Sequence, residues 1–461
     1  MRIATTARLA FLTAAIAAVA LLLLAGCASG QYRYRTEAEV ASLLAESTPF
    51  YPPARFAVIS DLHIYDTTLG SEGEAFQEYL ARDRKLLVEG REILQTASNR
   101  ILDSDVDFII VPGDLTKDGE LASHLMCAEA LGELEEGGKN VYVVPGNHDV
   151  QNPHALSYSV EGVKPVETVD ALRFAQIYHE YGYGEALSRD PVSLSYVAEP
   201  TDGLLLLAID SCDYEQNGEL DDPVVAGRLR AEQIAWIEQV LLDAVRDGKA
   251  VVAMMHHGLI EHYDSQAKHF GDYVLADYQQ IGRMLAAYGV RVVFTGHYHA
   301  QDIVRADFTT GLVYDVETGS LVTYPCPIRF VSVQDGIMAI RSERITQIPS
   351  FAERKADFAD YARDTVFRGI NDIAVETMVG LGMQEAEARG LSGQITEAFL
   401  AHYQGDEEFI GQEMIRLRGL SLTGRLVVGI RKDLVYGLWE DLEPPDDSIS
   451  IDLVHGSWTR H

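Results

Sequence analysis

Cysteine is scarce in this chain, and positive charge is scarce relative to negative charge. The 461 residues include 4 cysteines, and 37 Lys and Arg stand against 70 Asp and Glu, for a formal net charge of −33. After Cys27 only Cys127, Cys212 and Cys326 remain, so at most one disulfide can form within a chain and the fold is not held by disulfides. A surface this acidic repels polyphosphate backbones, which argues against a groove for duplex nucleic acid. Internal repeats and low-complexity segments are also lacking, and the hydrophobic content of 47% is ordinary for a globular protein.

The first 26 residues are typical of an export signal. Arg2 and Arg8 precede an apolar run, Leu9–Leu24, and small residues follow it. The sequence Leu24-Ala25-Gly26-Cys27 resembles a bacterial lipobox, which implies cleavage before Cys27 and a lipid on its sulfur. A plain signal peptide and a single transmembrane anchor are the alternatives. We therefore expect an exported protein that is lipid-anchored to the outer face of the cell membrane or to the bacterial envelope.

The remaining chain divides into three parts. Residues 27–54 are predicted to be a tether with one helical turn near Glu37–Leu44. Residues 55–345 alternate strand-like and helix-like segments, and their later strands are short and separated by turn glycines, which favours two packed sheets flanked by helices. Residues 346–461 are predicted to be a helical C-terminal region. The predicted helices of the middle part are Tyr79–Leu102, Lys117–Gly132, Leu172–Tyr183, Ala231–Ala244 and Gln279–Tyr288. The fold class is thus α/β, with a C-terminal helical appendage.

Five short polar motifs each follow an apolar, β-branched run of the kind that forms a buried strand. The motifs are Asp61-Leu62-His63, Gly113-Asp114, Gly146-Asn147-His148-Asp149, Met255-His256-His257-Gly258 and Gly296-His297-Tyr298-His299. Ligands in layered α/β folds gather at strand ends, so we expect these motifs to converge.

The residue types in the motifs are those of a metal site. Asp61 and His63 lie two apart, as do His297 and His299, and a strand would place each pair on one face, toward one ion. Gly113 and Gly146 are suited to a sharp turn and to a close approach of the backbone to a ligand. His148, beside Asn147, can face a substrate, and Asp149 is predicted to fix its tautomer and raise its pKa.

Taken in order, these motifs resemble those of the calcineurin-like metallophosphoesterases, from about Phe56 to His299. The resemblance implies a two-sheet sandwich with a dinuclear metal site at one edge. It implies that Asp61, His63, Asp114 and His299 hold the first metal, that Asp114 bridges, and that Asn147, His256 and His297 hold the second. Family precedent favours His256 over His257 as the ligand and leaves His257 near the substrate. Gln233 and Trp236 resemble a Gln-x-x-Trp-(Leu/Ile) helix motif of the same family. The order and spacing of the motifs resemble the cyclic-nucleotide phosphodiesterase-like branch and its exported relatives.

These expectations lead to a phosphodiesterase that uses two-metal hydrolysis, possible substrates being cyclic nucleotides. Histidine and Asn ligands suit Fe, Mn, Zn or Co better than Ca, and the identity of the metals stays open. His148 is expected to stabilise or protonate the leaving oxygen, assisted by Asp149. A phosphomonoesterase or nucleotidase would use the same ligands, and a non-catalytic surface binding lipoprotein is the alternative from a different class.

Overall fold

The computed structural model describes residues 37–46, 49–159, 162–309, 311–408, 411, 415 and 417–460. The expected signal peptide, residues 1–26, and the expected lipidation site, Cys27, lie outside these residues. Within them, every helix is too short or too polar to span a bilayer.

The first sheet has seven strands in the order β16-β15-β14-β13-β1-β2-β3. Its strands are β1 (Ala54–Val58), β2 (Phe108–Val111), β3 (Asn140–Val143), β13 (Pro327–Gln334), β14 (Ile337–Arg344), β15 (Ser448–Asp452) and β16 (Trp458–Arg460). Strands β1, β2 and β3 are mutually parallel, and the other pairings are antiparallel. Strand β2, which lies between the other two parallel strands, is apolar and buried at all four residues, because both faces of the sheet are covered there.

The second sheet has seven strands in the order β11-β12-β10-β9-β8-β7-β6. Its strands are β6 (Ser188–Arg189), β7 (Tyr196–Thr201), β8 (Leu204–Ile209), β9 (Ala250–Met255), β10 (Val292–Thr295), β11 (Asp302–Phe308) and β12 (Gly311–Glu317). Strands β8, β9, β10 and β12 are parallel, and the outer strands pair antiparallel. A separate hairpin joins β4 (Leu156–Ser159) to β5 (Gly162–Pro165).

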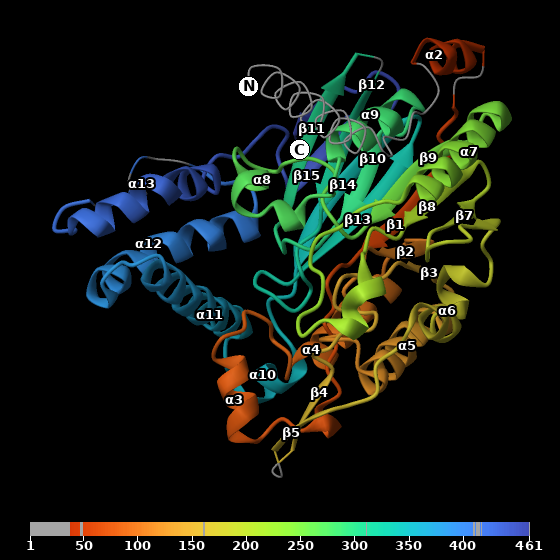
Figure 1. Ribbon diagram of the computed structural model, residues 1–461. Coiled ribbons are helices and arrows are strands. Elements are labelled where there is room, and N and C mark those ends of the chain that lie inside the picture. The colour runs from red at the N-terminus through yellow and green to blue at the C-terminus, as the bar shows by residue number, and fades with distance from the viewer. Residues whose placement is uncertain are drawn as a thin grey trace, which may run out of the picture.

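The two sheets pack face to face with helices outside, as the sequence predicts (Figure 1). Phe56 of β1 and Phe294 of β10 meet across the layers, with ring centroids 5.4 Å apart. Apolar residues of α7 (Ala231–Asp247) and α9 (Tyr278–Ala287), such as Ile237 and Leu285, cover the outer face of the second sheet. The same part of the chain also contains α3 (Glu74–Leu80), α4 (Gly90–Leu102), α5 (Leu121–Glu136), α6 (Ala171–Ile177) and α8 (Gln266–His269).

Two expected segments differ in detail from the structure. The predicted helix Tyr79–Leu102 is interrupted, because α3 ends at Leu80 and α4 begins at Gly90. The tether also contains more structure than one turn. Helix α2 (Glu37–Glu46) packs on α7 and α9, which cover the second sheet, through the fully buried Val40.

The C-terminal region is helical only in part. The helices here are α10 (Pro349–Arg354), α11 (Phe358–Gly380), α12 (Glu385–Gln404) and α13 (Leu422–Gly437). Helices α11, α12 and α13 lie on the side of the sandwich opposite α5 and α6, whereas α10 lies beside α4 (Figure 1). The last residues return as β15 and β16 and extend the first sheet beyond β14. The expectation of a helical region over residues 346–461 was therefore wrong for its end, because alternating Ile449 and Ile451 bury one face of a strand against the sandwich core.

Candidate dinuclear metal centre

The five polar motifs all lie at one edge of the sandwich, where the parallel strands of both sheets end. Asp61 follows β1, Asp114 follows β2 and Asn147 follows β3 in the first sheet. His256 follows β9 and His297 follows β10 in the second. The carboxyl ends of neighbouring parallel strands meet at the same edge, so chain segments far apart in sequence form one site.

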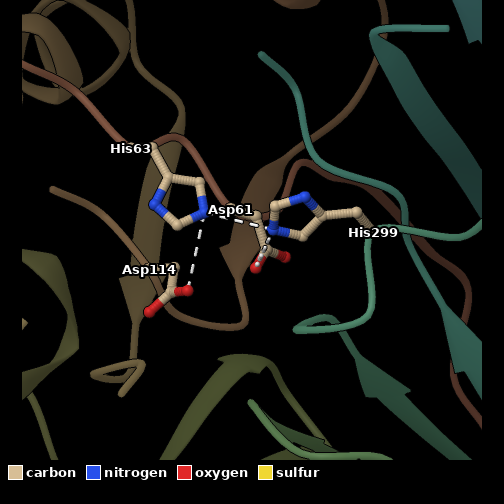
Figure 2. Close-up of side chains that lie close together, drawn as sticks. All are labelled: Asp61, His63, Asp114 and His299. Carbon is tan, nitrogen blue, oxygen red and sulfur yellow. Dashed lines mark hydrogen bonds and ion pairs between the residues drawn. The ribbon is translucent and has the colours of Figure 1, made fainter. Parts of the chain in front are cut away.

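The first cluster of side chains contains Asp61, His63, Asp114 and His299, all of them buried (Figure 2). The Nε2 atoms of His63 and His299 face each other at 3.2 Å. Asp114 Oδ2 lies 3.5 Å from His63 Nε2, and Asp61 Oδ1 lies 3.5 Å from His299 Nε2. Two carboxylate oxygens and two imidazole nitrogens therefore converge on one small space.

The second cluster contains Asp114, His256 and His297, so Asp114 belongs to both. Asp114 Oδ2 lies 3.5 Å from His256 Nε2, the same distance as to His63 on the other side. Asn147 Oδ1 lies 3.1 Å from His256 Nε2. The seven residues expected to hold metals are thus brought together, with Asp114 placed between the two groups.

Backbone conformation at these residues differs from the strand geometry assumed in the sequence argument. Asp61, His63, Asp114, His297 and His299 have positive φ angles of 50°, 39°, 50°, 76° and 70°. Such angles are uncommon for residues other than glycine and cluster at functional sites. The prediction that His297 and His299 face one ion together was wrong, because His299 belongs to the first cluster and His297 to the second.

Glycines allow the close approach that the clusters require. A Cβ on Gly146 would lie 2.1 Å from Asp114 Oδ1, and one on Gly113 would lie 2.6 Å from His256 Nδ1. Both distances are far below van der Waals contact, so any side chain at either position would displace a ligand. The expectation that these two glycines bring the backbone close to the site agrees with the structure.

The protonation states fit metal binding. Burial lowers the pKa values of His63, His297 and His299 well below the usual range, and the neutral imidazole is the form that binds a metal. Burial raises the pKa of Asp61 to about 7, which shows how poorly this site tolerates an uncompensated carboxylate. A metal ion would supply the missing positive charge.

His256 gives a further test of the fit. Its Nδ1 donates to the carbonyl of Pro112 at 2.9 Å, which directs Nε2 into the cluster. Burial opposes a charge on this imidazole, but the adjacent Asp114 carboxylate outweighs burial and raises its pKa to about 9. A second proton would therefore reside on Nε2, between His256 and the oxygens of Asp114 and Asn147. A cation at that position would replace the proton, and the imidazole, amide and carboxylate donors suit an ion of the Fe, Mn, Zn or Co type.

His148 lies beside both clusters without belonging to either. Its ring meets that of His63 edge to face, with centroids 4.9 Å apart, and its Nε2 is 4.0 Å from Asp114 Oδ2. Its side chain is 25% exposed, more than those of His63 and Asp114. Burial lowers its pKa, but the carboxylates of Asp114 and Asp118 outweigh that effect and raise it. His148 is thus an accessible imidazole that favours the protonated form.

The residue that orients His148 is Asp118, and the assignment of Asp149 to this role was wrong. His148 Nδ1 bonds Asp118 Oδ1 at 2.8 Å. Asp149 instead accepts hydrogen bonds from the backbone amides of Leu115, Thr116 and Gly146 and from the Thr116 hydroxyl. These bonds point the Asp149 carboxylate away from the imidazole and tie the loop after β3 to the loop after β2. Asp149 therefore supports the loops that carry the ligands and does not orient His148.

His257 is also unsuited to its expected role as a substrate contact. It is fully buried, its Nδ1 accepts from the Ser211 hydroxyl at 2.8 Å, and its Nε2 donates to the Val225 carbonyl at 2.8 Å. Both ring nitrogens are therefore occupied by the protein. Its ring centroid lies 4.5 Å from that of His297, so His257 packs against that ligand.

Three residues beside the centre were missed by the sequence argument. The positive charges of Arg84 and Lys85 act on His299 and contribute to its lowered pKa. The ring of Tyr273 lies 4.4 Å from that of His297. Arg84 and Lys85 lie between α3 and α4, and Tyr273 follows α8, so none of them follows a strand. A search of strand ends could not have found them.

Comparison with known proteins identifies the family. A family model described as calcineurin-like phosphoesterase matches residues 54–301, more than half of the chain. No curated protein matches significantly. Among solved structures, a dimetal phosphatase from Danio rerio is 15% identical with a TM-score of 0.44, and the match covers 64% of this chain and 97% of that one.

Two further solved structures resemble the chain over part of their length. A purple acid phosphatase from yellow lupin, Lupinus luteus, is 13% identical with a TM-score of 0.41, and the match covers 64% of this chain and 52% of that one. A protein described as a 5'-nucleotidase from Staphylococcus aureus is 14% identical with a TM-score of 0.35, over 61% of this chain and 51% of that one. On the family match and on the two-sheet fold, this chain belongs to the calcineurin-like phosphoesterases.

Proposed function

We propose that this protein is a metal-dependent phosphodiesterase that is exported and anchored to a membrane through a lipid on Cys27. The observation that supports the reaction is the pair of buried ligand clusters that share Asp114, with the accessible imidazole of His148 beside them. Two ions bound there supply Lewis-acid chemistry, since they neutralise phosphate charge and lower the pKa of water. The complete donor set argues against a non-catalytic binding protein.

The protein's own groups have distinct tasks in this reaction. The seven ligands would hold the two metal ions. The cations of Arg84 and Lys85, of which Lys85 is also paired with Asp83, favour an anion locally in a chain whose net charge is −33. His148 donates a proton to the leaving oxygen, and Asp118 holds the imidazole by its Nδ1 so that Nε2 faces the centre. A phosphate ester of a poor leaving group needs this proton most.

A diester is the preferred substrate because the motif order resembles the cyclic-nucleotide phosphodiesterase-like branch. A phosphomonoesterase is the second candidate, and the two extra cations at Arg84 and Lys85 favour it, since a monoester carries more negative charge than a diester. The acidic surface argues against duplex nucleic acid as a substrate for either activity.

The test compares bis-p-nitrophenyl phosphate with p-nitrophenyl phosphate on protein reconstituted with Mn, Fe, Zn or Co. We expect a higher kcat/KM for the diester and loss of both activities on chelation. A higher kcat/KM for the monoester would refute the phosphodiesterase assignment and support a phosphomonoesterase. No activity on either ester with metal bound would refute both.

The anchor rests on the Leu24-Ala25-Gly26-Cys27 sequence. The mature protein should begin at Cys27, carry lipid by mass spectrometry and partition into detergent. Cys27→Ser should abolish lipid attachment. A water-soluble mature protein that begins elsewhere would refute the anchor and leave the catalytic proposal intact.

A further inference from the structure

The C-terminal helices enclose an apolar cavity that the reaction described above does not use. It lies between α11, α12, α13 and the segment that follows α8, and its volume is about 280 Å³. Its walls include Ile370 and Met378 from α11, Leu391 and Ile395 from α12, and Val428 from α13. This volume lies just below the ~300 Å³ at which the usual size range of small-molecule pockets begins, and such pockets are lined mainly by apolar side chains, as here.

One wall of this cavity is shared with the metal centre. Tyr273 and Tyr403 line the cavity, and their ring centroids lie 4.4 Å from His297 and 6.5 Å from His299. Arg84 lines the same wall, and its buried Nε atom finds no hydrogen-bond partner among the described residues. The two tyrosine rings thus stand between the metal ligands and the cavity, and the Arg84 side chain hydrogen-bonds both of them. The organic part of a phosphate ester held at the metals would pass beside this wall to enter the cavity.

The outer surface of α13 carries a second apolar feature. Leu422, Leu426 and Ile430 repeat every four residues and are 87%, 63% and 56% exposed. Arg425 and Lys432 are exposed on the same helix, while Asp433 is paired with Lys268 and His269. An exposed apolar stripe flanked by basic residues is typical of a helix that lies on a lipid surface. In Figure 1 this helix extends away from the sandwich.

We propose that the substrate is an amphipathic phosphate ester whose hydrocarbon chain occupies the cavity between α11, α12 and α13. The substrate enters the cavity from a lipid surface, which Leu422, Leu426 and Ile430 of α13 contact. The proposal rests on the proposed phosphoesterase function and specifies the organic part of its substrate. At ~30 Å³ per water-sized group, the cavity holds about nine such groups, which sets the length of chain that can be enclosed. The polar end remains at the metals, near the positive charge of Arg84.

The first experiment measures chain-length dependence in the intact, metal-loaded protein. Alkyl p-nitrophenyl phosphates with methyl, butyl and octyl groups are compared below their micelle concentrations. Each methylene that enters the cavity should lower KM by about two- to fourfold, so KM should fall from the methyl to the butyl to the octyl ester. Equal KM values along the series would overturn the proposal.

A matched pair of variants tests the location. Ala374 lines the cavity and is buried, whereas Ala386 on α12 is exposed and lies outside the cavity lining. Ala374→Phe should remove most of the preference for octyl over methyl, and Ala386→Phe should keep it. The same preference in both variants would place the chain elsewhere and overturn the cavity assignment.

A binding measurement separates this proposal from the proposed function. Octylphosphonate should bind more tightly than methylphosphonate by calorimetry, whether or not the protein hydrolyses any ester. Activity without any chain-length effect would refute the cavity proposal alone, and chain-dependent binding without activity would refute the proposed function alone.

The lipid surface is tested with vesicles of phosphatidylcholine and phosphatidylglycerol. Protein that lacks residues 1–27 is used, so that a lipid on Cys27 cannot contribute. The triple change Leu422→Ser, Leu426→Ser and Ile430→Ser should weaken co-sedimentation with vesicles at least tenfold. Leu172→Ser, which changes an equally exposed leucine on α6, should have no such effect. No difference between the two would show that α13 is not the contact and that a chain is taken only from free molecules.

Discussion

The assignment of Asp118 as the residue that orients His148 can be tested by Asp118→Asn. This substitution keeps the shape of the side chain and replaces the carboxylate that bonds Nδ1 at 2.8 Å by an amide. Asp118 bonds His148, which belongs to neither ligand cluster, and Asp118 is itself in neither cluster. We therefore expect the metal content to be unchanged. The imidazole should then lose its fixed orientation and part of its preference for the protonated form.

The size of the effect follows from the bond that is lost. Hydrogen bonds to charged groups contribute about 1.5–3 kcal/mol, and about 1.36 kcal/mol changes a rate tenfold. Asp118→Asn should therefore lower kcat by roughly ten- to hundredfold on an alkyl ester. A general acid contributes ~10²–10⁴-fold, so His148→Ala should lose more than Asp118→Asn.

Stability has to be controlled, because Asp118 is also an ion-pair partner of the buried Lys117. Breaking a buried pair costs about 3–5 kcal/mol. Here Lys117 keeps Glu120 at 3.5 Å and the ring of Tyr79 at 4.5 Å, which should reduce the loss. Glu120→Gln is the matched control, since it perturbs Lys117 without touching His148.

The assay measures kcat for a series of diesters whose leaving groups range from nitrophenol to an alkyl alcohol. Asp118→Asn should show a small loss with nitrophenol and a large one with the alcohol, because nitrophenolate leaves without protonation. Glu120→Gln should lower the melting temperature without changing this dependence. If the two variants lose activity equally across the series, Asp118 is only structural and the argument for its role fails.

Two other expectations follow from the structure. Asp114→Asn should lower occupancy at both metal sites by elemental analysis, whereas His63→Ala should mainly empty the first and Asn147→Ala the second; two full equivalents of metal in Asp114→Asn would contradict the bridging position. Burial raises the pKa of Glu317 to about 8, above the unfolded value of about 4.3. The protonated carboxyl therefore contributes to stability at pH values below 4.3, and this contribution, at most about 5 kcal/mol, is lost as the pH rises to 8. Glu317→Gln should therefore flatten the fall in unfolding free energy between pH 5 and pH 8, measured by denaturant titration, and an unchanged slope would contradict it.

The layered fold was largely predictable because its strands are strong local signals. The run Phe108–Val111 is β2 over the same residues, and the expected strand Ala250–Met254 is one residue shorter than β9. The return of the chain end as β15 and β16 was not predictable. Five alternating residues have too little local preference to reveal a partner, and β15 is specified by its pairing with β14, which lies more than a hundred residues earlier.

The candidate ligands were predictable for a chemical reason, and their supporting residues were not. Few residue types bind metals, so an Asp, His or Asn directly after a buried strand is conspicuous in a sequence. The partners of these ligands need only reach them in space. Asp149 is adjacent to His148 in sequence yet is occupied by four hydrogen bonds of the loops, while Asp118 reaches the imidazole from thirty residues away. Sequence proximity favoured the wrong carboxylate, because a turn separates side chains that a strand or helix would have kept together.

The same reasoning explains why the site needs so many supporting residues. Five of its ligands have positive φ, a conformation that costs of order 1–3 kcal/mol at each residue other than glycine. Local sequence cannot maintain such a backbone, so tertiary bonds must do so. Asp149 fixes the loops after β2 and β3, the Ser320 hydroxyl donates to the Asp61 carbonyl at 2.8 Å, and the His297 amide donates to the Asp61 carboxylate. Changes to supporting residues such as Asp149 and Ser320 should therefore lower metal affinity first, and lower activity as a consequence, because these residues hold the ligands in place.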